Sequence, residues 1–335
     1  MSKMKNRVVW INGKLVPESD ARVSIYDSAL MFGDMVFEMT RSFRKVQFKL
    51  KEHLERLYAS VKFLHIPLTM SMAEMEKHIH ETVEANDPLF ADDDEHRLMI
   101  DVSRGILSIY QGVEGLPKGP NVIIADFPLR WTVAGMGSLY DTGINAVVPS
   151  QRAIPAQLLE PKVKNRSRLH YLMANIEVSR YAGENNWALL LDPDGFIAEG
   201  TGDNFFIVKD GGLITPEPRN ILRGISRAHV FDLAKKLGLS CLEKNIELYD
   251  VVTADEAFMT GTPFCILPVS SINSVPIGQG AMGPLTRKLL DTWSSGVGVD
   301  IIGQIKKWDA RRGAQTSSGP SPYRFKNDPQ KRLSR

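Results

Sequence analysis

Glu199-Gly200-Thr201-Gly202-Asp203-Asn204 separates two short apolar runs, 196–198 and 205–208, that are typical of β-strands. Gly200 and Gly202 carry no Cβ atom, so the backbone there can approach a flat ligand closely. Glu199 places a carboxylate at the end of the first strand. Such a glutamate fits a surface turn as well as a binding site, so its meaning depends on partners elsewhere in the chain.

Lys164 is the first of these partners, about thirty-five residues earlier in the stretch Pro161-Lys162-Val163-Lys164-Asn165-Arg166. A lysine amine attacks a carbonyl only when it is neutral, so its pKa must fall through burial or a neighbouring cation. Lys162 and Arg166 could supply that positive field. On spacing alone, an ordinary lysine in a basic run is the commoner explanation, and Lys162 is the obvious rival.

Two later segments could bind an anion. Arg223-Gly224-Ile225-Ser226-Arg227 opens a predicted helix, whose N-terminus presents free N–H groups. Ser226 could cap this helix and bind a phosphate, although a plain cap is the commoner role. Thr262, between Gly261 and Pro263, could add a hydroxyl and an N–H group. Arg56, on an earlier helix, could bind the same phosphate with two N–H groups.

A reactive lysine, a carboxylate for a ring nitrogen and a phosphate site are what a protein needs to hold pyridoxal 5′-phosphate. We therefore predict that cofactor, with Lys164 as the catalytic residue, and hypothesise an aminotransferase. The predicted cofactor-binding residues are Arg56, Lys164, Glu199, Gly224, Ile225, Ser226, Gly261 and Thr262.

The overall composition is that of an ordinary globular protein of 335 residues, with 43% hydrophobic and 24% charged residues. A net charge of +2 gives no indication of a nucleic-acid or membrane partner. The two cysteines are too few for a disulfide framework and lack metal-ligand spacing, so we expect no metal site. Neither a signal-peptide pattern nor a membrane-spanning stretch is evident, and a cytoplasmic setting is predicted.

The order of predicted elements indicates an α+β fold in two domains. We predict a small N-terminal domain over 1–129, an aperiodic linker over 130–143 and a large cofactor-binding domain over 144–309. Residues 310–335 are rich in Gly, Ser, Pro, Lys and Arg and predict a disordered or loosely docked tail.

The periodicity of apolar residues predicts the individual elements. Hairpins are expected at 8–16 and between 36–41 and 46–48, and strands at 97–102 and 122–127. Helices are expected at about 54–65, 71–85, 227–237 and 284–293. The helix after Lys164 carries Leu169, Leu172, Met173 and Ile176 on one face. Further strands are predicted at 187–191, 196–198, 205–208, 213–215, 256–260 and 266–269.

In their order and spacing, these motifs resemble the class IV aminotransferases of fold type IV over roughly residues 8–295. FGDMVFE at 32–38 resembles the family's YGDGVFE segment, and EHLERL at 52–57 resembles its EHxxRL helix, whose arginine binds phosphate. Residues 199–204 are close to its EGSGEN signature, 222–227 resemble LxGITR, and 260–262 resemble its TGT loop. Lys164, and not Lys162, fits the register of the catalytic lysine.

The resemblance implies a small α+β domain, a larger domain with a β-barrel-like core, and the cofactor between them. It also implies at least a homodimer, in which the partner's N-terminal domain closes the site. Arg97 would read a glutamate co-substrate. The substrate-binding residues that it implies are Phe32, Phe37, Arg97, Thr262 and Pro263.

Within the family, the branched-chain aminotransferases are the most similar group, through Asp203 before Asn204 and through GPLTR at 283–287. D-amino-acid aminotransferases and aminodeoxychorismate lyases resemble the chain at 102–105 but continue with a substrate-binding arginine that 106–111 lacks. The implied reaction moves an amino group from a branched-chain-like L-amino acid to a 2-oxo acid such as 2-oxoglutarate. The alternatives are a D-amino-acid or (R)-amine transaminase, a lyase-like enzyme of the same fold, or a non-catalytic relative.

Three positions depart from the branched-chain pattern. Arg168-Leu169 stands where an asparagine–tyrosine pair is usual, and Tyr171 is not expected to replace that tyrosine directly. Glu95 stands in place of a substrate-side tyrosine. Pro263 has no N–H group for a carboxylate. These departures leave the identity of the amino donor open.

Overall fold

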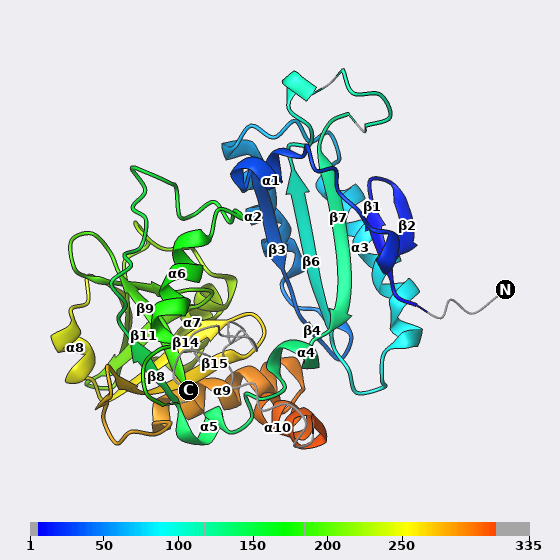
Figure 1. Ribbon diagram of the computed structural model, residues 1–335. Coiled ribbons are helices and arrows are strands. Elements are labelled where there is room, and N and C mark those ends of the chain that lie inside the picture. The colour runs from blue at the N-terminus through cyan, green and yellow to red at the C-terminus, as the bar shows by residue number, and fades with distance from the viewer. Residues whose placement is uncertain (1–5, 111, 117, 184, 313–335) are drawn as a thin grey trace, which may run out of the picture.

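The computed structural model describes residues 6–110, 112–116, 118–183 and 185–312, which form two units side by side (Figure 1). The N-terminal unit contains a five-stranded sheet in the order β2-β1-β7-β6-β3. Every neighbouring pair in it is antiparallel. Its strands are β1 (Val8–Ile11), β2 (Lys14–Pro17), β3 (Met35–Met39), β6 (His96–Ser103) and β7 (Asn121–Pro128).

Two helices cover one face of this sheet and leave β3 at the edge nearest the second unit (Figure 1). The helix α2 (Leu50–Phe63) buries Leu54, Leu57 and Val61, which confirms the predicted apolar face. The helix α3 (Met72–Asn86) begins with a capping box between Ser71 and Glu74. The unit also contains α1 (Ser28–Phe32) and the 3₁₀ turns η1 (Glu18–Asp20), η2 (Asp87–Leu89) and η3 (Ser108–Tyr110).

The predicted hairpin between 36–41 and 46–48 is wrong, because the first of these segments pairs with a different strand. β3 pairs with β6 along its whole length, and the hairpin is a separate one between β4 (Ser42–Phe43) and β5 (Val46–Gln47). Arg44 and Lys45 at its turn have φ angles of 53° and 67°. Two consecutive left-handed residues make a tight two-residue turn, so the chain reverses after β3 has ended.

The second unit is built around a closed barrel of six strands in the order β10-β9-β8-β15-β14-β11, which the β10–β11 pairing closes. The β8–β9 and β8–β15 pairs are parallel and the others antiparallel. This confirms the predicted α+β fold with a barrel-like core. The barrel strands are β8 (Ile144–Val147), β9 (Asn186–Leu191), β10 (Ile197–Gly200), β11 (Asn204–Lys209), β14 (Glu256–Gly261) and β15 (Cys265–Ile272). Outside the ring lie β12 (Gly212–Thr215), β13 (Cys241–Glu243) and β16 (Val275–Pro276).

The helices of this unit include two that the sequence pattern did not indicate, α8 (Leu248–Val252) and α10 (Ile301–Arg312). The helix α7 (Ile225–Leu237) ends at the predicted Gly238, whose φ is 68°, and α9 (Pro284–Val297) begins at its proline. Because α10 continues to Arg312, the first residues of the predicted tail are helical; residues 313–335 lie outside the described part. No helix within the described ranges is long and apolar enough to cross a membrane.

The predicted linker is more ordered than its sequence indicates. It contains α4 (Arg130–Val133) and α5 (Leu139–Thr142), each about one turn long, which is too short to show helical periodicity. Val133, Leu139 and Tyr140 are buried in the same apolar cluster as the barrel. The assignment of domain boundaries at 129 and 144 stays a prediction.

The helix α6 (Leu169–Val178), directly after the lysine segment, turns its predicted apolar face outward. Leu169 is 69% exposed and Met173 50% exposed, whereas Ala174, Asn175 and Val178 are buried. Small residues therefore face the barrel.

Candidate active site

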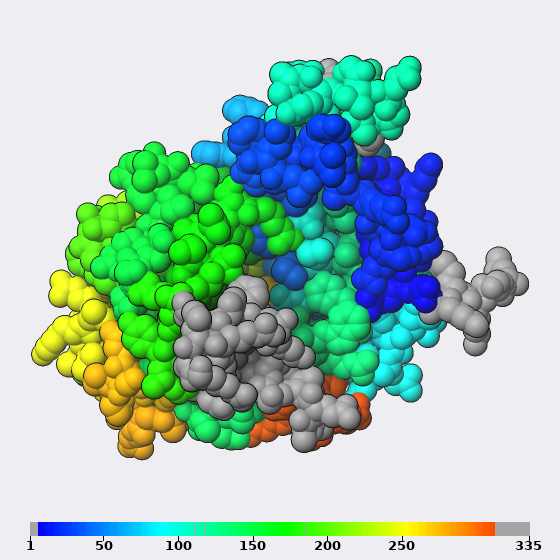
Figure 2. Space-filling model, in the orientation of Figure 1, coloured from blue at the N-terminus to red at the C-terminus, as the bar shows by residue number. Residues whose placement is uncertain are grey.

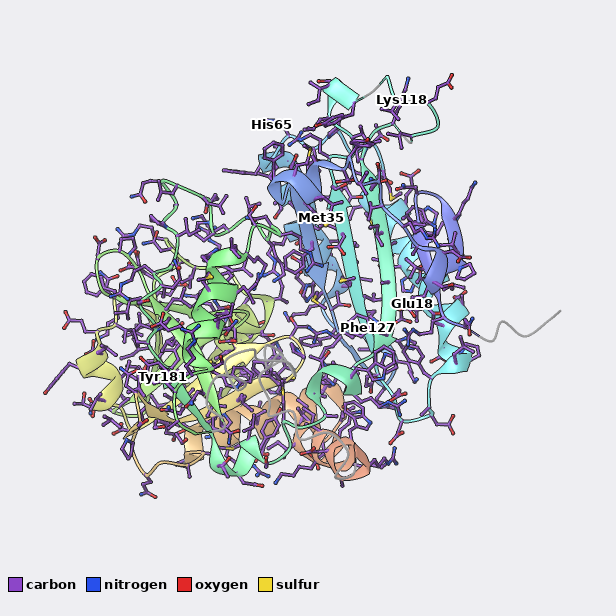
Figure 3. The ribbon with its side chains drawn as sticks, in the orientation of Figure 1. Glu18, Met35, His65, Lys118, Phe127 and Tyr181 are labelled. Carbon is purple, nitrogen blue, oxygen red and sulfur yellow. The ribbon has the colours of Figure 1, made fainter. Side chains whose placement is uncertain are left out.

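Lys164 lies on a segment that is attached to the edge of the N-terminal sheet. The Phe37 N–H donates to the Lys164 carbonyl at 2.9 Å, and the Arg166 N–H donates to the Met35 carbonyl at 2.9 Å. Met35 is labelled in Figure 3, at the start of β3. The backbone of Lys164 is thus held by one unit, and α6 leads from it into the other.

A cavity brings the predicted cofactor residues together, and Figure 2 shows a hollow where the two units meet. Lys164 lines this cavity, and so does every other predicted cofactor residue: Arg56, Glu199, Gly224, Ile225, Ser226, Gly261 and Thr262. Lys162 does not line it, because its ammonium pairs with Glu160 and donates to the Arg219 carbonyl. The structure therefore separates the two rival lysines.

Burial is the main cause of the lowered pKa of Lys164, which falls to about 7, and the positive charge of Arg56 lowers it further. The neighbours that the sequence suggested are not its main cations. Lys162 is paired with Glu160, and Arg166 donates to Asp101 at 2.7 Å. At a pKa near 7 a large fraction of the amine is neutral at physiological pH, which is the state needed for attack on a carbonyl.

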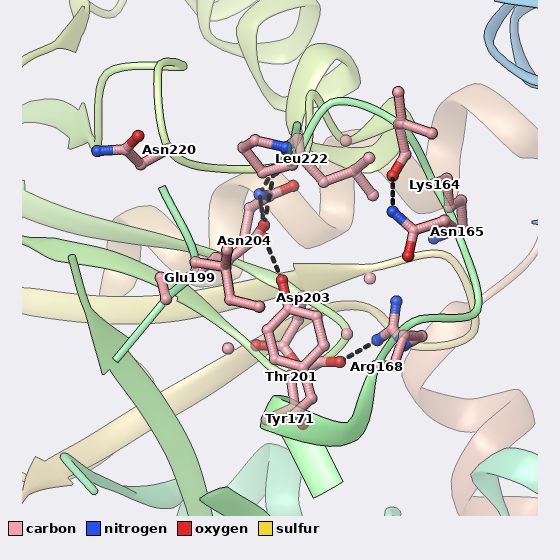
Figure 4. A pocket seen from close by; sticks show the side chains of 18 of the residues that line it. Lys164, Asn165, Arg168, Tyr171, Glu199, Thr201, Asp203, Asn204, Asn220 and Leu222 are labelled. Carbon is pink, nitrogen blue, oxygen red and sulfur yellow. Dashed lines mark hydrogen bonds between the residues drawn. The ribbon is translucent and has the colours of Figure 1, made fainter. Parts of the chain in front are cut away.

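Glu199 is a buried carboxylate with three hydrogen-bond donors (Figure 4). It accepts from the Tyr171 hydroxyl at 2.8 Å, the Leu222 N–H at 3.0 Å and the Asn204 side-chain amide at 3.1 Å. Burial raises the pKa of Glu199, while the bonds from Tyr171 and Leu222 oppose that rise. The carboxylate is consequently oriented before any ligand arrives.

Tyr171 is a site residue that the sequence analysis missed. It was not expected to replace the usual tyrosine, and its hydroxyl instead holds Glu199 from the wall of the cavity. The missed signal was helical spacing, since position 171 lies on a different face of α6 from the exposed Leu169.

Arg56 is held by a second buried carboxylate, Glu38. Its Nε and Nη2 atoms donate to the two Glu38 oxygens at 2.6 and 2.8 Å, and its Nη1 donates to the Arg223 carbonyl at 2.8 Å. His53 Nδ1 also lies 2.8 Å from Glu38. Burial would raise the pKa of Glu38, but Arg56 and His53 outweigh it and hold that pKa far below its usual range. Glu38 ends the FGDMVFE motif and His53 lies in the EHLERL motif that contains Arg56. Membership in these motifs was the sequence signal that could have identified both residues.

The start of α7 forms the other wall of the predicted phosphate site. Its N-cap is Gly224 with no side-chain cap, so the capping role predicted for Ser226 is wrong. A Cβ atom at Gly224 would lie 2.0 Å from the Asn204 side-chain oxygen, so the close approach requires glycine. The Thr260 hydroxyl nearby is buried and has no partner among the described residues.

This donor set fits pyridoxal 5′-phosphate. The buried amine of Lys164 and the carboxylate of Glu199 line the same cavity as the α7 N-terminus, Thr262 and Arg56. The last three can meet a phosphate with N–H groups, a hydroxyl and a guanidinium. The unpartnered Thr260 hydroxyl adds a polar group that a ligand could satisfy.

A second cavity opens from the first at Lys164 and contains most of the predicted substrate residues. Phe37, Arg97, Thr262 and Pro263 line it. Its other walls include the apolar side chains of Met39, Met136, Trp187 and Phe264. We call this second cavity the substrate chamber.

Arg97 is the most buried cation of the substrate chamber. It is 8% exposed, and its Nε and Nη1 atoms have no partner among the described residues. Burial lowers its pKa to about 10. Within the described part of the chain, the third nitrogen, Nη2, contacts only the Met39 sulfur at 3.6 Å. A buried guanidinium with so few partners is costly unless a ligand satisfies it, which favours an anionic substrate group there.

Two predicted or suspected substrate positions lie elsewhere. Phe32 is 67% exposed at the end of α1 and does not line the chamber. Glu95 accepts hydrogen bonds from Ser42 Oγ and from the Arg44 and Lys45 N–H groups. It therefore holds the β4–β5 hairpin.

Comparison with known proteins identifies the family to which this chain is similar. The family model described as amino-transferase class IV matches residues 35–272. A Methanocaldococcus jannaschii protein provisionally assigned as a branched-chain-amino-acid aminotransferase is 40% identical, over 84% of this chain and 93% of its own.

Two crystal structures are similar throughout. The Escherichia coli branched-chain amino acid aminotransferase has a TM-score of 0.78 and 30% identity, covering 88% of this chain and 94% of its own. A T.th. branched-chain amino acid aminotransferase, complexed with N-(5′-phosphopyridoxyl)-L-glutamate, has a TM-score of 0.75 and 30% identity, covering 92% of this chain and 98% of its own. With its family match, barrel and lysine-centred cavity, this chain belongs to the class IV aminotransferases.

Proposed function

We propose that the chain is a pyridoxal-phosphate-dependent transaminase that moves an amino group from a branched-chain L-amino acid to 2-oxoglutarate. The observation that carries the proposal is the position of Lys164, where the cofactor cavity meets the substrate chamber. The apolar walls of the chamber suit a branched side chain. The buried Arg97 suits the second carboxylate of 2-oxoglutarate.

We assign the residues as follows. When bound, the cofactor supplies a carbonyl that bonds to amines and a pyridine ring that withdraws electrons. Lys164 Nζ would hold the cofactor and, when released from it, would take up and return the substrate proton as general base and acid. Glu199 keeps the ring nitrogen protonated, and Tyr171 orients Glu199. Arg56, Ile225, Ser226 and Thr262 hold the phosphate.

The test is the visible absorption spectrum of the purified holoenzyme, recorded after separate additions of L-leucine, D-alanine and (R)-1-phenylethylamine. Loss of the cofactor band with L-leucine, and glutamate formation with 2-oxoglutarate, are the expected results. A response to D-alanine or to the amine alone would assign the D-specific or (R)-amine reaction instead. Lys164→Ala should abolish turnover and leave the folded state intact, and near-normal turnover of that variant would contradict the assignment.

We also propose that the enzyme is at least a homodimer. Leu30, Met31 and Phe32 of α1 are exposed, as are Leu169 and Met173 of α6. The two helices adjoin, because the Ser167 hydroxyl donates to the Phe32 carbonyl at 3.0 Å. The contiguous apolar surface that they form suits a second copy of the chain, and it would place Phe32 near the partner's site.

Sedimentation velocity tests the dimer. The wild type is expected to sediment as a dimer or larger species, and Leu169→Glu should shift it toward the monomer because a charge would be buried in the contact. A monomeric wild type would overturn this part of the proposal. We further propose a cytoplasmic setting, which the two unpaired cysteines Cys241 and Cys265 support.

A further inference from the structure

We propose that Arg168 binds the carboxylate next to the reacting carbon of the substrate and thereby selects amino and 2-oxo acids over uncharged compounds. The inference rests on the proposed function and adds a specificity-determining residue to it. It concerns a position where this chain differs from the branched-chain pattern, in which an asparagine is usual.

The first observation is the place of Arg168 between the two cavities. It lines both the cofactor cavity and the substrate chamber, as do Lys164 and Thr262. The guanidinium carbon of Arg168 lies 5.5 Å from the centre of the Phe37 ring, and Lys164 Nζ lies 4.8 Å from the same centre. The charge of Arg168 also helps to lower the pKa of Lys164, so the cation lies within electrostatic range of that amine.

The second observation is that Arg168 is held in place without an acidic partner. Its guanidinium carbon also lies 4.7 Å from the centre of the Tyr171 ring, and its Nη2 donates to the Thr201 carbonyl (Figure 4). Within the described ranges, no carboxylate forms an ion pair with it, in contrast to Arg166, which Asp101 neutralises, and Arg56, which Glu38 neutralises. A fixed guanidinium with free N–H groups is ready to bind a carboxylate.

Asp203 does not fully neutralise the positive charge of Arg168 at neutral pH. Asp203 lines both cavities, and one of its oxygens is buried without a partner among the described residues. Burial and the charge of Glu199 raise the pKa of Asp203 to about 8, despite the opposing effect of Arg168. Glu199 also faces Arg168, but its oxygens already accept from Tyr171, Leu222 and Asn204, and within the described ranges it forms no ion pair with Arg168.

The third observation concerns the turn after Thr262, which also lines the substrate chamber. Pro263 lines the substrate chamber but has no N–H group, and its carbonyl accepts from Arg41 Nη1 at 3.1 Å. The turn after Thr262 thus offers a carboxylate no donor at that residue. Besides Lys164, which the proposed function assigns to the cofactor, Arg97 is the other chamber cation without an acidic partner in the described part of the chain, and the proposed function assigns it to the far carboxylate of 2-oxoglutarate. Arg168 is then the chamber cation available to bind the carboxylate next to the reacting carbon.

The experiment compares two matched ligands that do not react, 4-methylvalerate and its uncharged amide, by calorimetric titration of the pyridoxal-phosphate-loaded enzyme. The wild type should bind the acid more tightly than the amide. In Arg168→Gln the affinity for the acid should fall ~10- to 100-fold, the range expected for a lost hydrogen bond to a charged group. The affinity for the amide should change less than about 3-fold, so the preference for the acid collapses.

Three further measurements separate this role from a structural one. Arg168→Lys should restore part of the preference, because it keeps the charge. Arg180→Gln, at an exposed arginine two residues beyond α6, should leave the preference unchanged. The affinity for the cofactor should be the same in wild type and Arg168→Gln.

An unchanged preference in Arg168→Gln would overturn the inference. So would equal losses for acid, amide and cofactor, since these would mean that Arg168 only supports the Thr201 loop or contacts the cofactor. Because the titration needs no turnover, its result is independent of which amino donor the enzyme uses. Failure of the proposed function would instead appear as no spectral response to any donor, or as a response to D-alanine or (R)-1-phenylethylamine alone.

Discussion

At Lys164, loss of hydration is the main effect that lowers the pKa of the amine. Burial and the Arg56 charge lower its pKa to about 7, and Glu38 and Glu199 partly oppose them. The protonated amine cannot attack a carbonyl, so reactivity must rise as pH rises through this pKa.

We predict that the rate at which the cofactor-free enzyme captures pyridoxal phosphate rises with a midpoint near pH 7 and levels off about one pH unit above it. Stopped-flow recording of the cofactor band measures it. Lys162→Ala is the matched control and should show the same profile, because Lys162 pairs with Glu160 and does not itself line the cavity. A midpoint near 10, about the value of an ordinary lysine, would contradict the burial argument.

Tyr171 acts through Glu199, and Tyr171→Phe tests this. Removal of the 2.8 Å hydrogen bond takes away a contribution that lowers the pKa of Glu199. A hydrogen bond to a charged group contributes about 1.5–3 kcal/mol, so we expect kcat to fall ~10-fold or more. Tyr249→Phe, at a side chain 75% exposed on α8, is the control and should leave kcat unchanged. A Tyr171→Phe enzyme within twofold of wild type would contradict the assigned role.

At the scale of elements, the start of α7 and the end of β10 are coupled through Asn204. Its amide donates to Glu199 and to the Leu222 carbonyl, and its oxygen lies against Gly224. The phosphate wall and the carboxylate for the ring nitrogen therefore share one side chain.

Gly224→Ala should disturb the start of α7 and the orientation of Glu199 together. The added Cβ would lie 2.0 Å from the Asn204 oxygen, so the amide must move away from Glu199. We expect the affinity for the cofactor to fall ~10-fold or more, as for loss of a buried hydrogen bond to a charged group. Gly296→Ala, where a Cβ would meet nothing within 4 Å on the exposed side of α9, should leave that affinity unchanged. Equal affinities in the two variants, measured by fluorescence titration, would count against the coupling.

At the scale of the whole molecule, the cofactor cavity belongs to both units. Arg56 comes from α2 of the N-terminal unit, and Glu199 and Gly224 from the barrel unit. Lys164 lies on the segment that joins them through its hydrogen bond with Phe37.

We therefore predict that pyridoxal phosphate stabilises both units together. At about 100 times its dissociation constant the cofactor should add about 2.7 kcal/mol to the free energy of unfolding. Calorimetric scans with and without cofactor should show a single transition that moves upward. Lys164→Ala should show a smaller shift. Two transitions, of which only one responds, would mean that the units unfold separately.

The positions of most elements could be predicted from the sequence, and so could the set of residues that meet around one cavity. Val230 and Leu233 face inward on α7 as their spacing indicates, and the described site contains every predicted cofactor residue. The failures occurred where local pattern carries little information. The one-turn helices α4 and α5 show no periodicity, β3 pairs with a strand far along the chain, and the apolar face of α6 points outward.

By itself, the sequence determined where most strands, turns and longer helices form, because glycines, capping residues and apolar spacing act through the local backbone. It also determined which lysine, carboxylate and helix start were candidates for a cofactor. Only the tertiary structure decided that Lys164 is buried and Lys162 paired, that Tyr171 holds Glu199, and that Arg168 lines both cavities without an ion-pair partner among the described residues. The burial of a side chain, its hydrogen-bond or ion-pair partners and the electrostatic field that it experiences depend on residues distant in the chain. No local sequence pattern therefore predicts them.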